Sequence, residues 1–317
     1  MKFKKSYKRK KNGTIADKYK YSTGQLFNFA RNSYLERTSR PIYAVFFLLP
    51  FIIFYEIGTF LINTDVLNQS QIRVVAFVWL QNLLESLGFG GKFAWVAPPL
   101  AVVVILIALQ ITSGKRWHFL FGDILPMSIE CILLAVPLIV LTLFLSSSTV
   151  LQDDIGQADN SAVLIITEPL PSCSSTADNG LSSSSNQVGA DEQSQPLLAN
   201  IVTGIGAGIY EELVFRLILI CILMLLFQDV LRLTHKNSII LSVLISAALF
   251  SAHHHVDFLS GQLNNIDPFN LTRFAFRTIA GIYFAVLFAI RGFGITAGTH
   301  AFYNIIAVSI TARFFQQ

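Results

Sequence analysis

The sequence predicts an all-α fold, a polytopic membrane helix bundle of seven or eight transmembrane helices around a polar cavity. Of the 317 residues, 53% are hydrophobic and only 13% are charged, and the mean hydropathy is +0.57. Soluble domains carry about 25% charged residues. The apolar residues also gather in long runs separated by short polar breaks, which is the pattern of segments that cross a bilayer.

Residues 1–40 form a basic N-terminal tail. They hold 12 of the 23 lysines and arginines, with only Asp17 and Glu36 as acidic residues. Positive charge flanking membrane helices stays on the cytoplasmic side, so we expect a cytoplasmic N-terminus in an integral protein of the bacterial inner membrane. Such a tail also suits anionic lipid headgroups, and we favour the lipid bilayer over nucleic acid as its partner.

Residues 41–146 are predicted to hold the N-terminal transmembrane helices. Clear apolar runs, each long enough to cross the hydrocarbon core, occupy residues 42–62, 94–111 and 124–146. Residues 72–89 are ambiguous, because Gln81, Asn82 and Glu85 would be costly against lipid. Counting this segment gives eight spans. The distribution of positive charge between the spans favours seven.

Residues 147–198 carry Ser-rich stretches and seven acidic residues but no lysine or arginine, so we expect a flexible, solvent-exposed linker. It separates the first helices from a C-terminal transmembrane half, residues 199–317. Four further apolar runs lie at residues 199–227, 238–254, 273–290 and 293–313. This half holds the polar residues that suggest a catalytic function.

Charged residues interrupt the run at 199–227. Glu212 and Arg216 are four residues apart, so they share a helical face and can form a buried ion pair. Glu211 points about 100° away from Glu212 and is left free for chemistry. Since an ionised side chain costs at least about 2.5 kcal/mol at the centre of a membrane helix, we expect this cluster to be functional rather than a packing salt bridge alone.

Three histidines, residues 253–255, end the next run. Successive helical residues rotate by about 100°, so at most two of them can reach a common site. Phe250 and His254 share a face by the four-residue spacing. The other histidines can cap the helix end or face water.

His300 and Asn304 share a face of the last run in the same way. Asn304 alone would be read as an interhelical hydrogen bond, but the two side chains together offer two donors to a developing oxyanion. With Glu211 as general base and His254 positioning the water, three helices therefore supply the parts of a hydrolase.

Glu211-Glu212-x-x-x-Arg216, Phe250-x-x-x-His254 and His300-x-x-x-Asn304 resemble, in this order, the three motifs of the CAAX-protease and bacteriocin-processing family of intramembrane proteases. The resemblance covers roughly residues 199–313. It implies Glu211 as the water activator, Glu212 and Arg216 as structural partners, His254 as water ligand or second base, and His300 with Asn304 as oxyanion donors. Leu249 in the aromatic position would instead select His253.

The resemblance also implies an endopeptidase whose substrate is a membrane protein or a lipidated peptide, with CAAX-type prenyl-protein processing as one reaction. We prefer a mechanism without a metal. The alternative is a zinc ion held by Glu211, His254 and His300, which leaves one position for water.

Two other function classes remain open. An ion-coupled transporter would use the buried glutamates and histidines to relay protons, but the sequence has no inverted repeat. A non-catalytic membrane scaffold would not need the full set of polar residues. No nucleophile competes with water, since Ser251 lacks a Gly-x-Ser-x-Gly elbow.

Overall fold

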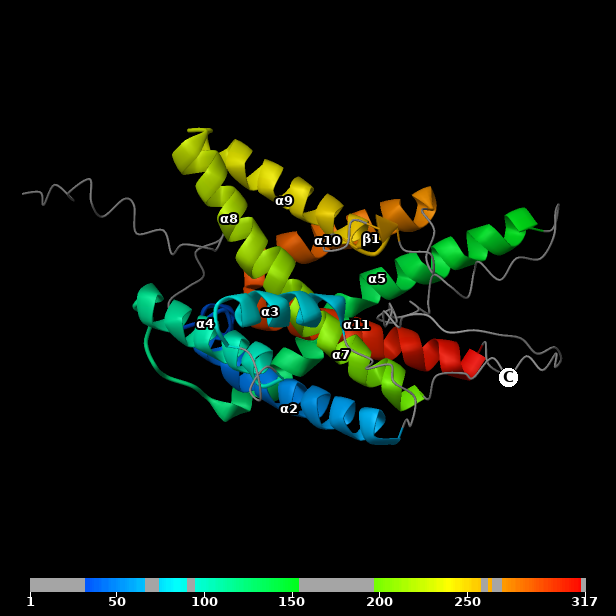
Figure 1. Cartoon of the computed structure of the whole chain (residues 1–317), viewed down its shortest axis with the longest axis horizontal. Coiled ribbons are helices and arrows are strands. Elements are labelled where there is room, and N and C mark those ends of the chain that lie inside the picture. The colour runs from blue at the N-terminus through cyan, green and yellow to red at the C-terminus, as the bar shows by residue number, and fades with distance from the viewer. Residues whose placement is uncertain are drawn as a thin grey trace, which may run out of the picture.

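The computed structural model describes residues 32–65, 74–89, 95–153, 197–257, 262–263 and 270–314. These residues are almost entirely helical, which confirms the predicted all-α fold (Figure 1). Most of the basic tail and residues 154–196 of the predicted linker lie outside the described residues. The helix that precedes the linker continues as far as Asp153.

Each predicted apolar run contains a helix. The first half of the chain forms α1 (Tyr34–Thr38), α2 (Pro41–Asp65), α3 (Val75–Ser86), α4 (Ala97–Ser113), the 3₁₀ turn η3 (Phe121–Asp123) and α5 (Ile124–Asp153). The second half forms α7 (Leu197–Glu212), η4 (Leu213–Leu219), α8 (Ile220–Leu225), η5 (Leu226–Val230), α9 (His235–Ala252), α10 (Leu271–Arg291) and α11 (Phe293–Phe314). The strands β1 (Val256–Asp257) and β2 (Gln262–Leu263) pair antiparallel between α9 and α10. The sequence did not predict α1, this hairpin, or the π-helical geometry of η4 and η5.

Within the described residues, six helical segments are long and apolar enough to cross a membrane. They cover Pro41–Ile62, Phe121–Leu145, Leu197–Val230, His235–Ala252, Leu271–Arg291 and Phe293–Arg313. Helix α4 is apolar and slightly shorter, with 17 residues. Helix α3 has 12 residues, so it rises only about 18 Å, well short of a hydrocarbon core of about 30 Å. The sequence predicted seven or eight membrane spans, and the short length of α3 favours seven.

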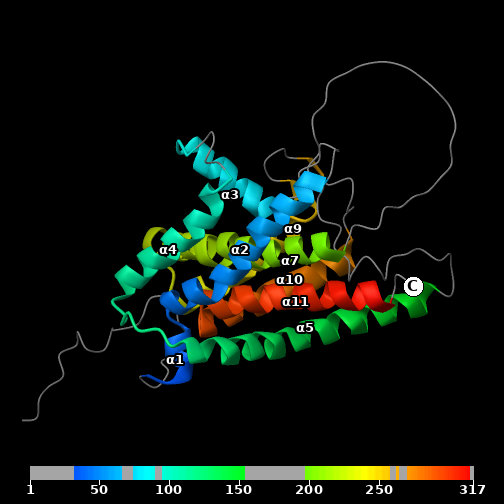
Figure 2. The same ribbon diagram turned by 90° about the horizontal axis from the view of Figure 1, so that it is seen from below.

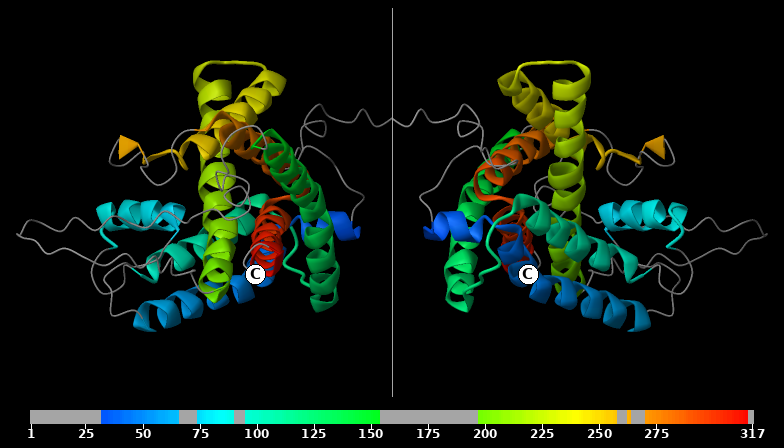
Figure 3. Two further views of the ribbon diagram at one scale, coloured as in Figure 1. Left: turned by 90° about the vertical axis from the view of Figure 1, so that its right-hand side faces the viewer. Right: turned by 90° about the vertical axis from the view of Figure 1, so that its left-hand side faces the viewer.

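Helices α7 and α11 form the centre of the bundle. They pack against each other along their lengths, with α2 on one side and α5 on the other (Figure 2). The chain then turns back after η5, and α9 packs against α10 and α8 (Figure 3). Residues on α7, α9 and α11 therefore meet inside the bundle.

Small residues let α7 and α11 approach closely. A Cβ atom added to Gly208 would lie 2.5 Å from the backbone nitrogen of Ala301, and one added to Gly204 would lie 2.9 Å from Cβ of Asn304. Membrane helices use such small residues to bring backbones into contact. This contact sets the distance between the glutamates of α7 and the histidine of α11.

Polar contacts hold the short helix α1 against the end of the bundle. Arg291, at the end of α10, donates to Glu130 of α5 at 2.5 and 2.7 Å and to the hydroxyl of Thr38 at 2.8 Å. Arg40 hydrogen-bonds Glu36 within this segment and holds the pKa of that carboxyl below its usual value. These contacts join α1, α5 and α10 at one end of the membrane region.

We expect Gly208→Ala to destabilise the protein by about 1–3 kcal/mol, because its methyl group would press on the backbone of α11. Gly122→Ala is the matched control, since nothing lies within 4 Å of its added Cβ. Thermal unfolding in detergent measures both. Equal melting temperatures for the two variants would contradict the close α7–α11 contact.

Candidate active site

Two consecutive glutamates end α7, near the middle of the 34-residue membrane segment Leu197–Val230. Glu212 is fully buried, whereas Glu211 keeps 6% of its surface exposed. The helix rotates by about 100° between them, so their carboxylates point to different neighbours. The two side chains therefore have separate environments although they are adjacent in sequence.

Glu212 forms the ion pair with Arg216 that the four-residue spacing predicts. Oε2 of Glu212 lies 3.1 Å from Nε of Arg216, and both side chains are fully buried. The guanidinium carbon lies 4.1 Å from the ring centre of Phe250 on α9 and 5.7 Å from that of Phe284 on α10. Aromatic faces stabilise a cation removed from water, so these rings help to make the burial of Arg216 tolerable.

Glu212 also binds His300 of α11. Nδ1 of His300 lies 2.8 Å from Oε1 of Glu212, and Nε2 of the same ring lies 4.0 Å from Oε2 of Glu211. The imidazole stacks on Phe284, with ring centres 4.5 Å apart. When Nδ1–H donates to Glu212, the neutral ring presents the lone pair of Nε2 toward Glu211. Glu212 thus orients the histidine as well as the arginine.

The three consecutive histidines lie in a turn, because α9 ends at Ala252. Nε2 of His253 lies 3.8 Å from Oε1 of Glu211, and the rings of His253 and His254 have their centres 3.9 Å apart. One ligand atom each of Glu211, His253 and His254 lies within 4.8 Å of the other two. His255 faces Arg277 instead, at 3.5 Å. Both possible registers of the second motif therefore bring an imidazole to Glu211.

Burial lowers the pKa of His254 well below its usual value. Its imidazole is therefore neutral near neutral pH, which is the form that accepts a proton or binds a metal. The ring of Phe250 lies edge-on to it, with ring centres 5.5 Å apart. The sequence analysis chose His254 because it follows Phe250 by four residues. The two rings are in contact although His254 lies beyond the helix end.

Asn304 is held by the backbone of α7. Its Nδ2 donates to the carbonyl oxygen of Gly204 at 2.9 Å. This bond joins α11 to α7 about one turn away from His300, and it is the interhelical contact weighed above as the simpler interpretation of Asn304. Its use as an oxyanion donor remains a prediction.

Aromatic side chains that the sequence did not single out surround this cluster. The ring of His253 packs against Trp79 of α3 and Phe215, with ring centres 5.8 and 4.8 Å apart. Trp79 lies in the segment whose polar residues made its prediction ambiguous, and no local pattern marks it. A further carboxylate, Glu56 of α2, accepts a hydrogen bond from Tyr210 at 3.2 Å. Its position inside an apolar run was the signal that could have identified it.

The residues at this site fit a metal ion. Two imidazoles and a carboxylate are a donor set of catalytic zinc. Glu211, His253 and His254 meet the geometric condition for such a group, and the set predicted from sequence has His300 in place of His253. The hydrogen bond from His300 to Glu212 also has the form that orients metal-binding histidines. A bound metal would polarise a peptide carbonyl or activate a water molecule.

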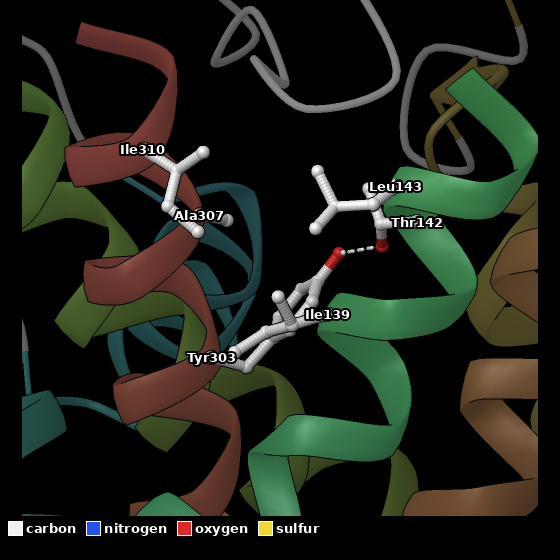
Figure 4. A pocket seen from close by; sticks show the side chains of 6 residues that line it. All are labelled: Ile139, Thr142, Leu143, Tyr303, Ala307 and Ile310. Atoms are coloured by element: carbon white, nitrogen blue, oxygen red, sulfur yellow. Dashed lines mark hydrogen bonds between the residues drawn. The ribbon is translucent and has the colours of Figure 1, made fainter. Parts of the chain in front are cut away.

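A pocket between α5 and α11 lies apart from this cluster (Figure 4). It is lined by Ile139, Thr142, Leu143, Tyr303, Ala307 and Ile310. Its two hydroxyl groups, on Thr142 and Tyr303, lie 3.0 Å apart and bond to each other. The lining side chains supply no acid, base or metal ligand, so the glutamate–histidine cluster is the candidate active site.

The fold and the cluster define a class: an integral, all-helical membrane protein with acid–base residues buried among its helices. Residues 193–306 match the family described as type II CAAX prenyl endopeptidase Rce1-like. This match covers 114 of the 317 residues and confirms the resemblance predicted from the three motifs; the matched family is one of endopeptidases. No curated protein and no solved structure matches the chain.

The sequence predicts that His254 positions the water, and for such a group we expect His254→Ala to lower kcat by about 10²–10⁴-fold. His255→Ala is the control and should stay within about tenfold, since its ring faces Arg277. Peptide cleavage by the folded fraction of each variant measures the effect. A large loss in His253→Ala with normal turnover in His254→Ala would select the other register.

Proposed function

We propose that this protein is an intramembrane endopeptidase that hydrolyses a peptide bond with a water molecule activated by Glu211. The observation that carries the proposal is the position of one free carboxylate between imidazoles. Glu211 lies 3.8 Å from His253 and 4.0 Å from His300. Its neighbour Glu212 already binds Arg216 and His300, so Glu211 is the carboxylate available for proton transfer.

The geometry accommodates a water molecule. Three ligand atoms that lie within 4.8 Å of one another can all be reached from a central point at about 2.8 Å, a normal hydrogen-bond distance. Zinc bonds of about 2.0–2.2 Å would draw the same atoms closer together. The spacing accommodates either a water or a metal ion, and our proposal uses a water held by protein groups alone.

The reaction needs one proton acceptor and no covalent intermediate. Glu211 removes a proton from the water as the oxygen attacks the carbonyl carbon of the peptide bond. Donors on the protein stabilise the negative charge on the carbonyl oxygen. Our candidates are the second N–H of the Asn304 amide and Nε2–H of His300 in its imidazolium form, in which Nδ1–H still binds Glu212. Glu211 then gives its proton to the leaving amine as the carbon–nitrogen bond breaks, which regenerates the carboxylate.

We further propose a substrate with a lipid anchor, either a C-terminally lipidated peptide of CAAX type or a membrane protein. A site buried between membrane helices is reached most directly by a peptide that is already at the bilayer. We place the basic N-terminus in the cytoplasm of a bacterial cell, with seven spans and the acidic segment 147–198 outside. Residues 199–317 form the catalytic half in this arrangement.

Substituting Glu211 by Gln should lower kcat by about 10²–10⁴-fold or more, so that cleavage is effectively abolished. The reason is that the amide cannot accept the proton. Glu56→Gln is a matched control, since it is also a carboxylate in a membrane segment but binds Tyr210 of α7. The assay follows a fluorescent prenylated peptide in proteoliposomes. Undiminished turnover in Glu211→Gln would rule out the mechanism.

Purified protein should contain less than about 0.1 zinc per chain and should keep its activity after treatment with a chelator, as expected for a metal-free mechanism. Elemental analysis and cleavage before and after chelation give the two measurements. About one zinc per chain, with activity lost on removal and restored on addition, would show that the glutamate and histidines bind a metal instead.

A further inference from the structure

The helix that carries the two glutamates changes its geometry immediately after them. Residues Leu213–Leu219 form a π-helix, in which each amide bonds to the carbonyl five residues earlier and each turn holds an additional residue. Such segments are rare, and they are frequently found at functional sites. This one contains Arg216, so the change of geometry lies between Glu211 and the cation that neutralises Glu212.

A serine on the neighbouring helix binds the main chain of this π-helix. Oγ of Ser246 on α9 donates to the carbonyl oxygen of Phe215 at 2.7 Å, and both residues are buried. A polar group of the backbone inside a membrane needs a partner, and the side chain of a neighbouring helix can supply it. Ser246 is therefore a side-chain donor to the irregular part of this helix.

Arg216 is held from two directions, by α9 and by α10. Phe250, one helical turn after Ser246, covers its guanidinium group. Ala247 packs against Gly281 of α10, whose carbonyl oxygen lies 3.5 Å from Nη2 of Arg216. Ser246 thus binds the main chain at Phe215, and the other contacts hold the side chain of the next residue, Arg216.

We propose that Ser246 is a positioning residue of the protease proposed above, on which this inference rests. Its hydrogen bond holds the π-helix in the register that directs Arg216 toward Glu212, and Glu212 in turn orients His300 opposite Glu211. Without this donor the segment can return to α-helical geometry, in which the turn holds one residue fewer. Residues on the two sides of the turn would then rotate by about 100° relative to each other.

The chain offers a matched control one turn away. Ser242 lies on the same face of α9 and is as fully buried as Ser246. Within the described part of the chain its hydroxyl has no hydrogen-bond partner. Removing that hydroxyl changes the helix packing as little as removing the one on Ser246, but it leaves the π-helix untouched.

The test compares Ser246→Ala with Ser242→Ala in the prenylated-peptide assay. We expect Ser246→Ala to lower kcat by about 10–100-fold with KM within about twofold, because small displacements of reacting groups cost this much. Ser242→Ala should stay within about twofold in both constants. A kcat for Ser246→Ala equal to that of the wild type, or an equal loss in Ser242→Ala, would overturn the inference.

Isosteric variants separate positioning from packing. Ser246→Thr keeps the hydroxyl and Ser246→Val replaces it with a methyl group of similar size, so both add the same volume. We expect kcat of the Thr variant to exceed that of the Val variant by at least about tenfold at similar melting temperatures. Equal kcat values would refute the role of the hydrogen bond.

A double-mutant cycle with Arg216→Lys adds a third readout. If Ser246 acts through Arg216, the effect of Ser246→Ala on kcat should shrink to less than about threefold in the Lys background. Additive effects would contradict the inference. Cleavage by Glu211→Gln would instead contradict the proposed function itself. Failure of the Ser246 inference and failure of the proposed function are therefore distinguishable.

Discussion

The buried carboxylate of Glu212 is the constraint on which the rest of this structure depends. A fully buried charge in a membrane is tolerated only when partners of opposite charge or hydrogen-bond donors surround it. Glu212 has both, since Arg216 lies 3.1 Å from one carboxylate oxygen and His300 lies 2.8 Å from the other. Because these partners come from the following turn and from α11, satisfying one charge brings the two central helices together.

Arg216 extends this constraint to two more helices. Its guanidinium group is as fully buried as the carboxylate, and it lies against Phe250 of α9 and Phe284 of α10. A buried ion pair can cost as much in desolvation as it gains in Coulomb energy, so the pair is better understood as a means of specifying geometry than as a source of stability. Here it specifies where four helices meet.

The sequence predicted the parts of this arrangement that follow from local periodicity. Long apolar runs identified the helices, and the four-residue spacing identified the pair of Glu212 and Arg216, because both depend only on the regular rotation of a helix. The position of the histidines could not be predicted in this way. Helix α9 ends at Ala252, so the regular rotation that would place His254 relative to Phe250 stops before it reaches His254.

Other features depend on contacts between distant residues. His300 was expected to donate to an oxyanion, and its Nδ1 binds Glu212 across the bundle. The amide of Asn304 binds the carbonyl of Gly204, a contact that requires the close approach of α7 and α11. The π-helix after Glu212 has no signature in its sequence, LVFRLIL. The contact between this π-helix and Ser246 of α9 appears only in the folded structure.

The two adjacent glutamates differ in their access to water, and the proposed mechanism assigns them different roles for this reason. A carboxylate that holds helices together must be sealed from water, and Glu212 has no exposed surface. A carboxylate that activates water must be reachable, and Glu211 retains a small exposed fraction beside His253. Because helical rotation turns neighbours about 100° apart, one helix can direct the first group toward the water of the proposed mechanism and the second into the core. If the residues were instead four apart, they would share one face and compete for the same arginine.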